Sequence, residues 1–279
     1  MNYKKLYDLR VYLSMSEKLT IIIPTINQHN YPKIIKKLEI LSYIKFQGKV
    51  VLSINADIKP IKISEDIQGS LNLIEFYHKI QLPIFDHFKF CIDSCTTEYV
   101  MLSADDDYIL ESISNVFSIL KQKHSIIFFP IDCKYASQTY TKVDYSWLCQ
   151  NNSNSMLKHF SDLHFYAIYN RRVFKKLLTL ILFDWKFCSK EHQSRRKAFL
   201  FGLAAYTLKR KRFFENNDVV MSFNLNYGGG RRLKNISSIS VDLQLLCSMY
   251  LLLKKRKVNF SKLHFLKFVL NRLRRGFLI

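Results

Sequence analysis

Three consecutive carboxylates, Asp105, Asp106 and Asp107, follow a short apolar segment and are the clearest candidates for chemistry in this sequence. Adjacent carboxylates repel one another, so a strand end that collects them needs a cation or a helix N-terminus close by. Mg²⁺ and Mn²⁺ prefer oxygen ligands, and one or two carboxylates commonly hold them together with substrate phosphates. The alternative is a solvated turn that caps a helix starting near Glu111, and the spacing alone favours neither interpretation.

The segments that must position these carboxylates are short, apolar and rich in β-branched residues, which is typical of strands buried on both faces. We expect strands at residues 19–24, 50–54, 71–76, 99–104 and 125–131. Helical periodicity follows Pro32 and recurs over residues 88–95 and 113–120. A further strand is expected near 164–169, with helices over 171–182 and 192–208. This alternation predicts an α/β fold with a mainly parallel sheet flanked by helices on both faces.

Polar residues also follow the first two expected strands. The first ends in Pro24-Thr25-Ile26-Asn27, and the second is followed by Asn55-Ala56-Asp57. In parallel sheets, ligands lie beyond the carboxyl ends of the strands. We therefore expect these groups to gather at one edge of the sheet, beside the three aspartates.

These motifs resemble the nucleotide-sugar glycosyltransferases of the GT-A fold, most closely the family-2-like group. In that group the first strand typically ends in P-T-x-N, and the fourth reads Y-V-x-x-x-x-D-D-D. Pro24-Thr25-Ile26-Asn27 matches the first pattern, and Tyr99-Val100 with Asp105-Asp106-Asp107 matches the second. The resemblance covers residues 18–130 well and extends loosely to about residue 225. It implies a GT-A (Rossmann-like) catalytic domain over residues 1–225, with a nucleotide-sugar-binding half at 18–140 and an acceptor half at 141–225.

The resemblance also implies roles for single residues. Asp107 would bind a divalent metal, Mn²⁺ or Mg²⁺, that bridges the donor diphosphate, and Asp105 would lie nearer the ribose and share the metal. The other residues implied to bind the donor are Pro24, Thr25, Asn27, Asp57 and Asp106. In this chain Ser53 and Asn55 come before Asp57, whereas the family's second strand usually delivers its acid sooner. Lys89 is a weaker donor-binding candidate, because its direction depends on the phase of its helix.

Transfer to an acceptor hydroxyl also needs a group that accepts the hydroxyl proton. Glu191 resembles the acid that such enzymes place at the start of a helix beside the acceptor, and Asp184 is the second candidate. The alternative role for Glu191 is to cap a helix that begins near His192. The resemblance to family 2 implies inversion at the anomeric carbon.

A glycine segment, Gly228-Gly229-Gly230, precedes two arginines, Arg231 and Arg232. Flexible glycines followed by guanidinium groups are suited to closing over a donor diphosphate. The alternative is an exposed linker with solvated arginines.

The chain has 279 residues and a formal net charge of +21, and that charge is unevenly distributed. Residues 1–140 contain 16 basic and 15 acidic residues, whereas residues 141–279 contain 27 and seven. Two basic amphipathic helices are expected in the C-terminal region, residues 226–279, where they either pack on the catalytic domain or lie on an anionic membrane. The sequence contains no apolar run of about 20 residues and no visible signal peptide, so we expect a cytoplasmic protein, with peripheral attachment to the inner membrane face left open.

The six cysteines include no C-x-x-C pair, and we expect neither disulfides nor a zinc site. His87, Cys91 and Cys95 share one helical face, which we interpret as a stripe facing the core rather than a metal site.

The sequence thus predicts a metal-dependent glycosyltransferase with a nucleotide-sugar donor and a saccharide or lipid-linked saccharide acceptor, acting in surface glycan, lipopolysaccharide or capsule synthesis. A nucleotidyltransferase is less suitable, because residues 26–31 provide no glycine-rich basic loop after the first strand. The rival is a basic protein without catalysis that binds nucleic acid or another polyanion, although the sequence lacks zinc-finger and RNA-recognition motifs.

Overall fold

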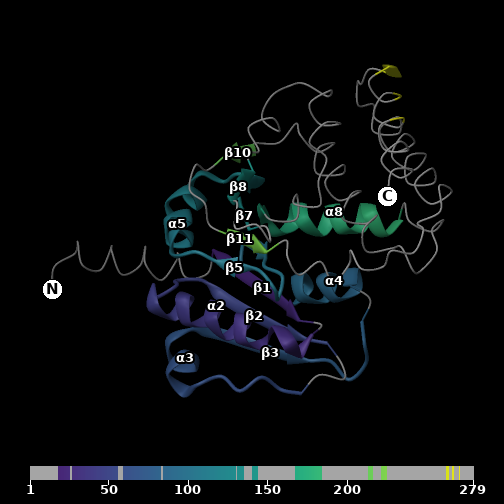
Figure 1. Cartoon of the computed structure of the whole chain (residues 1–279). Coiled ribbons are helices and arrows are strands. Elements are labelled where there is room, and N and C mark those ends of the chain that lie inside the picture. The colour runs from purple at the N-terminus through teal and green to yellow at the C-terminus, as the bar shows by residue number, and fades with distance from the viewer. Residues whose placement is uncertain are drawn as a thin grey trace. The chain divides into compact units, whose positions relative to one another are not determined.

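The computed structural model describes residues 18–25, 27–55, 59–82, 84–129, 131–134, 140–143, 167–183, 213–215 and 221–224, together with Lys262, Leu263, Leu266 and Leu270. The chain divides into two compact units, of which the first comprises residues 1–144, 166–178 and 212–227. Both sheets belong to this first unit (Figure 1). None of the helices within the described ranges is long and apolar enough to span a membrane.

A seven-stranded, mainly parallel sheet forms the centre of the first unit, in the order β10-β6-β9-β4-β1-β2-β3. Its strands are β1 (Leu19–Thr25), β2 (Lys49–Ile54), β3 (Asn72–Tyr77), β4 (Tyr99–Leu102), β6 (Ile126–Phe128), β9 (Ala167–Asn170) and β10 (Phe213–Glu215). Strands β1 to β4 are mutually parallel, whereas β9 runs antiparallel between β4 and β6. Every residue of β1 is buried, as expected for a central strand covered on both faces. The predicted α/β class and mainly parallel sheet are confirmed.

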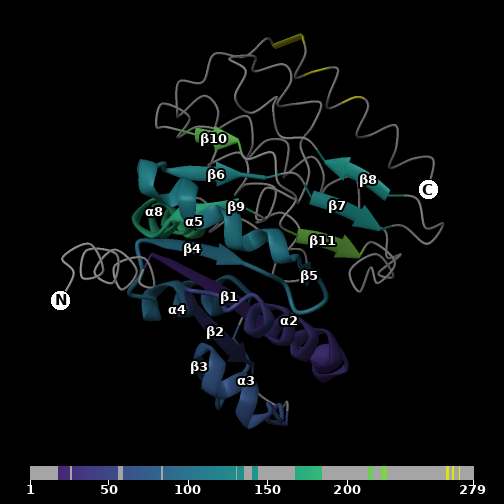
Figure 2. The ribbon, with the colours of Figure 1, turned by 90° about the vertical axis from the view of Figure 1, so that its left-hand side faces the viewer.

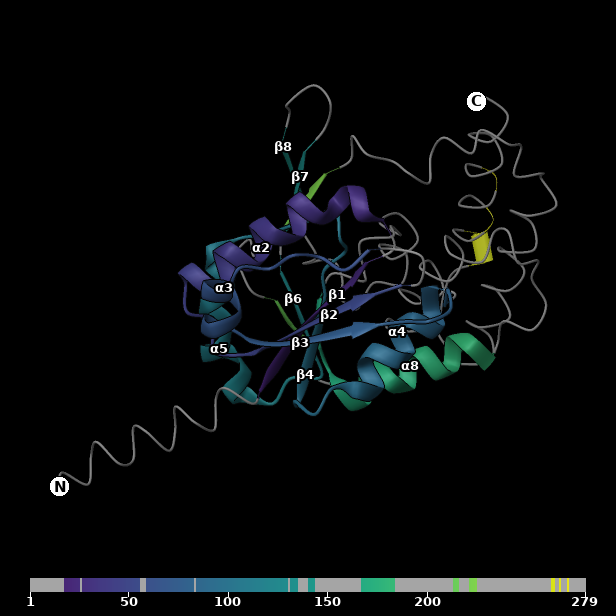
Figure 3. The same ribbon diagram turned by 90° about the horizontal axis from the view of Figure 1, so that it is seen from below.

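Helices cover both faces of this sheet (Figure 3). One face carries α2 (Tyr31–Tyr43), α3 (Glu65–Ser70) and α5 (Val116–Ile119), and the other carries α4 (Ile84–Ser94) and α8 (Arg171–Phe183). On the first face the ring of Phe46, just after α2, lies 5.4 Å from that of Phe117 in α5. α2, α4, α5 and α8 overlap helices predicted from the sequence, whereas α3 lies where no helix was predicted.

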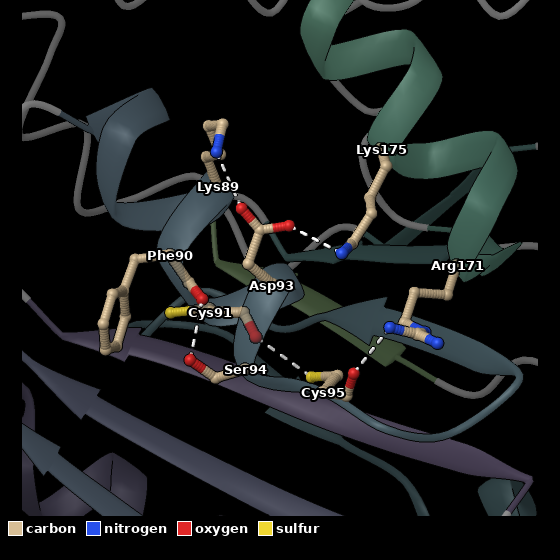
Figure 4. Close-up of polar contacts among 8 residues, drawn as sticks. All are labelled: Lys89, Phe90, Cys91, Asp93, Ser94, Cys95, Arg171 and Lys175. Atoms are coloured by element: carbon tan, nitrogen blue, oxygen red, sulfur yellow. Dashed lines mark hydrogen bonds and ion pairs between the residues drawn. The ribbon is translucent and has the colours of Figure 1, made fainter.

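Polar contacts join α4 to α8 on the second face (Figure 4). Asp93 of α4 forms ion pairs of 2.7 Å with Lys89 in its own helix and with Lys175 in α8. The guanidinium of Arg171, at the start of α8, donates a hydrogen bond of 2.8 Å to the main-chain oxygen of Cys95. Because both ion pairs are exposed to solvent, they orient the helices more than they stabilise them.

A smaller sheet has the order β5-β11-β7-β8 (Figure 2). It consists of β5 (Tyr108–Ile109), β7 (Ile131–Lys134), β8 (Tyr140–Val143) and β11 (Met221–Asn224). The three aspartates therefore occupy the connection from β4 in the large sheet to β5 in the small one. Both ends of this connection are fixed by strand pairing.

Two predicted elements differ in detail from the structure. The strand predicted at 125–131 is divided between β6 and β7, which belong to different sheets, and Pro130, which has no N–H for a ladder, separates them in the sequence. The helix predicted over 113–120 is a 3₁₀-α-3₁₀ succession: Glu111–Asn115, α5 and Leu120–Gln122. Serine hydroxyls bond carbonyls three residues back at Ser114 and Ser118, which competes with regular α-helical bonding.

The stripe of His87, Cys91 and Cys95 faces the core, as predicted. The three side chains are 0%, 0% and 3% exposed. Burial raises the pKa of the Cys91 thiol to about 12 and that of Cys95 to about 11, so both thiols are unreactive.

Gly48, immediately before β2, is expected to tolerate no side chain. A Cβ atom there would lie 2.5 Å from the main-chain oxygen of Leu19 and 2.6 Å from the ring of Phe46. Gly48→Ala should therefore lower the free energy of unfolding by about 1–3 kcal/mol through overpacking, measured by urea denaturation. Gly69→Ala in α3 is the matched control, because its Cβ would meet no atom within 4 Å. That control should be neutral or stabilising by up to about 1 kcal/mol; equal losses in the two variants would contradict the steric explanation.

Candidate functional site

Residues Ala104 to Asp107, called here the acidic turn, leave the carboxyl end of β4. The N–H of Ser103 donates to the oxygen of Ile22 in β1 at 2.9 Å, and the N–H of Asp107 donates to the oxygen of Ala104 at 3.3 Å. Asp105 is 7% exposed and Asp107 is 1% exposed, whereas Asp106 is half-buried. The turn therefore directs its first and third carboxylates into the protein.

A lysine from α2 accompanies these carboxylates. Lys37 is fully buried, and its ammonium donates a hydrogen bond to the main-chain oxygen of Ala104. Lys33, one turn earlier, approaches the main-chain oxygen of Asp106 at 3.4 Å. Burial lowers the pKa of Lys37 to about 8, although the negative charges of the acidic turn oppose this shift. Buried carboxylates and a buried ammonium thus compensate one another, as buried charges in proteins generally do.

Sequence reasoning missed Lys37, although the sequence contains a signal for it. Ile34, Leu38 and Leu41 form the buried face of α2, and Lys37 lies on that same face. A charged residue within an apolar helical stripe needs a buried partner, and an acidic cluster at a strand end is a natural candidate.

The carboxyl end of β1 lies next to that of β4, and the carboxyl end of β2 lies on the other side of β1. Asn55 follows β2, and its N–H donates to the oxygen of Thr25 at 2.9 Å. The hydroxyls of Thr25 and Ser103 are buried and have no hydrogen-bond partner among the described residues. Buried hydroxyls without partners are rare in folded proteins and point to a group that binds there.

The other described candidates have identifiable contacts. Pro24 lies in β1 opposite Ser53, beyond the last β1–β4 pair, so its missing N–H interrupts no bond to β4. Asn27 is exposed, and its side chain accepts a hydrogen bond of 3.0 Å from the N–H of His29. Lys89 is exposed and forms an ion pair with Asp93 within α4.

Five predicted site residues lie outside the part of the chain that the structure describes. They are Asp57, Asp184, Glu191, Arg231 and Arg232. The structure places Thr25 at the end of β1 and the three aspartates after the end of the neighbouring β4, and all the site assignments stay predictions.

Ser53 lies near the end of β2, and Asn55 directly follows that strand. The side chain of Asn55 donates to the oxygen of Leu82 at 2.9 Å and accepts from its N–H at 2.8 Å. Asn55 therefore fixes the segment that follows β3. The Ser53 hydroxyl lies 2.8 Å from Nε2 of both His78 and His87, and the two rings meet edge to face at 4.9 Å.

His87 is expected to make the stability of the protein depend on pH. Burial, aided by His78, lowers the pKa of His87 from 6.5 to about 4, and its Nδ1 has no hydrogen-bond partner among the described residues. Between these two pH values the unfolded chain binds a proton that the folded chain does not, so stability falls as the pH falls. The loss from this group should be about 2–3 kcal/mol.

Urea unfolding of the wild type and of His87→Gln between pH 7 and pH 4 measures this contribution. The variant should start less stable and lose less stability on acidification. Parallel curves for the two proteins would show that His87 is not the titrating group.

The chemistry of the acidic turn fits a divalent metal that is shared with a phosphate. Asp105 and Asp107 supply carboxylate oxygens, the ligand type that Mg²⁺ and Mn²⁺ prefer. Across the described ranges there is no group of three or more His, Cys, Asp or Glu side chains placed to hold an ion by themselves. A metal bound here would therefore complete its coordination with water and substrate phosphates.

Comparisons with known proteins identify the fold. A scan against protein-family models and a search of curated proteins found no match. Among solved structures, S. aureus TarS 1–349 aligns with 93% of this chain and 72% of its own, at 16% identity and a TM-score of 0.58. The same protein in complex with UDP-GlcNAc gives 17% identity and a TM-score of 0.60, and its complex with UDP gives 15% and 0.57. The chain thus has the fold of TarS, and the GT-A architecture expected from the sequence is confirmed.

Proposed function

We propose that this protein is a metal-dependent glycosyltransferase that moves a sugar from a nucleotide-sugar donor to an acceptor hydroxyl. One observation carries the proposal: the buried carboxylates of Asp105 and Asp107 lie at the same sheet edge as the buried, unpartnered hydroxyl of Thr25. That edge is where parallel α/β sheets bind their ligands. The fold is shared with TarS, which was solved in complex with UDP-GlcNAc.

The described residues have distinct tasks in this reaction. Asp107, with Asp105 beside it, would hold the divalent ion, and that ion would neutralise the charge on the leaving diphosphate. Asp105 also accepts a hydrogen bond from the donor ribose, and the hydroxyl of Thr25 binds the nucleotide. Asp106 orients the turn from its half-buried position. These groups bind and orient the donor before the acceptor arrives.

The remaining roles come from the sequence resemblance. Glu191, or Asp184 in its place, accepts the proton of the acceptor hydroxyl, and direct displacement inverts the anomeric carbon. Asp57, Pro24 and Asn27 belong to the donor pocket, and Lys89 has the weakest support because it is paired with Asp93. Arg231 and Arg232 would close over the diphosphate.

The acceptor is proposed to be a saccharide or a lipid-linked saccharide of a surface glycan such as lipopolysaccharide or capsule. Leu263, Leu266 and Leu270 are 59%, 53% and 56% exposed, and they recur at helical spacing in the basic C-terminal region. Leucines of this kind beside basic residues are suited to an anionic lipid surface. The proposal is a cytoplasmic protein whose C-terminal region either packs on the catalytic domain or attaches peripherally to the inner face of the membrane.

The proposal is tested by incubating the full chain with a panel of nucleotide-sugars, with and without Mn²⁺, and measuring release of the nucleoside diphosphate. One nucleotide class should be turned over, and only with the metal. DNA binding that falls steeply with salt, together with no turnover or binding of any donor, would instead support the basic polyanion-binding protein.

A further inference from the structure

Lys37 is a buried lysine of α2 whose ammonium contacts the acidic turn. Its ammonium donates to the oxygen of Ala104, which also accepts the N–H of Asp107 at 3.3 Å. All three carboxylates of the turn attract it, Asp107 most strongly and Asp105 next. Lys37 is 0% exposed, so solvent screens the charge of its ammonium only weakly.

The turn would be unstable without this cation. Asp105 and Asp107 are buried, and carboxylates so close together in the chain repel one another. The ammonium of Lys33 also approaches the turn, where it donates to the main-chain oxygen of Asp106 at 3.4 Å. Of these two lysines Lys37 is the fully buried one, so little solvent screens its charge from the buried carboxylates.

We propose that Lys37 is the built-in counter-cation of the acidic turn, a positioning residue that holds Asp105 and Asp107 in place before a divalent ion binds. That this role of Lys37 affects donor binding rests on the proposed function. Its first consequence is that the metal alone should bind weakly, because Lys37 already offsets much of the negative charge. The negative charge of a donor diphosphate restores the attraction, so metal and nucleotide should bind together.

The first test measures thermal unfolding of the full chain. Lys37→Met keeps the length of the side chain and removes its charge, and it should lower the unfolding midpoint by on the order of 10 °C, because buried carboxylates are left uncompensated. Lys36→Met is the matched control on the same helix, where the lysine is exposed, and it should shift the midpoint little. In the double variant Lys37→Met/Asp107→Asn, most of the loss should be recovered.

The second test adds millimolar Mn²⁺ without any nucleotide. Mn²⁺ should raise the midpoint of Lys37→Met by several degrees more than that of the wild type, because the metal replaces the missing ammonium. It should not rescue the double variant, which lacks the Asp107 carboxylate. A purely structural role for Lys37 would lower stability without any such rescue.

Several outcomes would overturn the inference. The first is an unfolding midpoint of Lys37→Met equal to that of Lys36→Met. The second is a double variant whose loss of stability is the sum of the losses in Lys37→Met and Asp107→Asn. The third is an equal rise of the midpoint with Mn²⁺ in Lys37→Met and the wild type. If Lys37→Met does not fold, the inference requires that Lys37→Met/Asp107→Asn does fold, and an unfolded double variant would contradict it. Neither test uses a nucleotide-sugar. If the predicted effects of Lys37→Met are observed but the protein binds no donor, the proposed function is refuted and the role of Lys37 still holds.

Discussion

Replacing Asp107 by asparagine should lower the rate of sugar transfer about a thousandfold. Charge stabilisation by a bound metal is worth several kcal/mol, and about 4 kcal/mol corresponds to this factor. Asp107 is 1% exposed at the carboxyl end of β4, so its carboxylate lies in a poorly solvated place where a bound charge acts strongly. The measurement is donor turnover as a function of Mn²⁺ concentration, with circular dichroism to verify the fold.

Asp106→Asn is the matched comparison, because it removes the same charge one residue away. Asp106 is half-buried and is contacted through its main chain by Lys33, so its loss should cost no more than about tenfold. Equal losses in the two variants would show that the net charge of the turn matters and the position of Asp107 does not.

Truncating Tyr169 to alanine should lower the free energy of unfolding by about 3–5 kcal/mol, the usual range for large aromatic residues in a core. Tyr169 is 0% exposed, and its ring stacks on Phe174 of α8 with centroids 4.7 Å apart and planes at 13°. It lies in β9, where it is paired with Val100 on one side and Ile126 on the other. The cavity would therefore open beside both β4 and β6, and urea denaturation measures the loss.

Tyr43→Ala is the control, since that tyrosine is 76% exposed at the end of α2. It should change stability by less than about 0.5 kcal/mol. A small effect at Tyr169 would mean that β9 contributes little to the large sheet, contrary to its position between β4 and β6.

The sheet could be predicted where apolar residues run without interruption. Leu19 to Thr25 is buried throughout, and such a run has one reasonable interpretation as a central strand. The insertion of β9 between β4 and β6 could not be predicted, because a short apolar segment does not specify its neighbours or its direction. The break between β6 and β7 was hidden for a related reason: the apolar pattern continues across Pro130 while the chain changes sheets.

The candidate site could be predicted where it follows from topology. Thr25 ends β1 and Asp105 follows β4, and the carboxyl ends of these parallel neighbouring strands must meet at one edge. The role of Asn55 could not be predicted, because its partner is the main chain of Leu82, 27 residues away in a loop. Lys37 follows from combining two local patterns, the acidic turn and a charged residue on an apolar helix face, that are usually considered separately.

The most direct test of the central claim is calorimetric titration of the full chain with nucleoside diphosphates and their sugars, with and without Mn²⁺. The account predicts that one nucleotide class binds at least about tenfold more tightly with Mn²⁺, an advantage of about 1.4 kcal/mol. Asp107→Asn should abolish this advantage. Binding of no nucleotide, or binding that neither Mn²⁺ nor the loss of Asp107 affects, would contradict a metal-dependent donor site at the acidic turn.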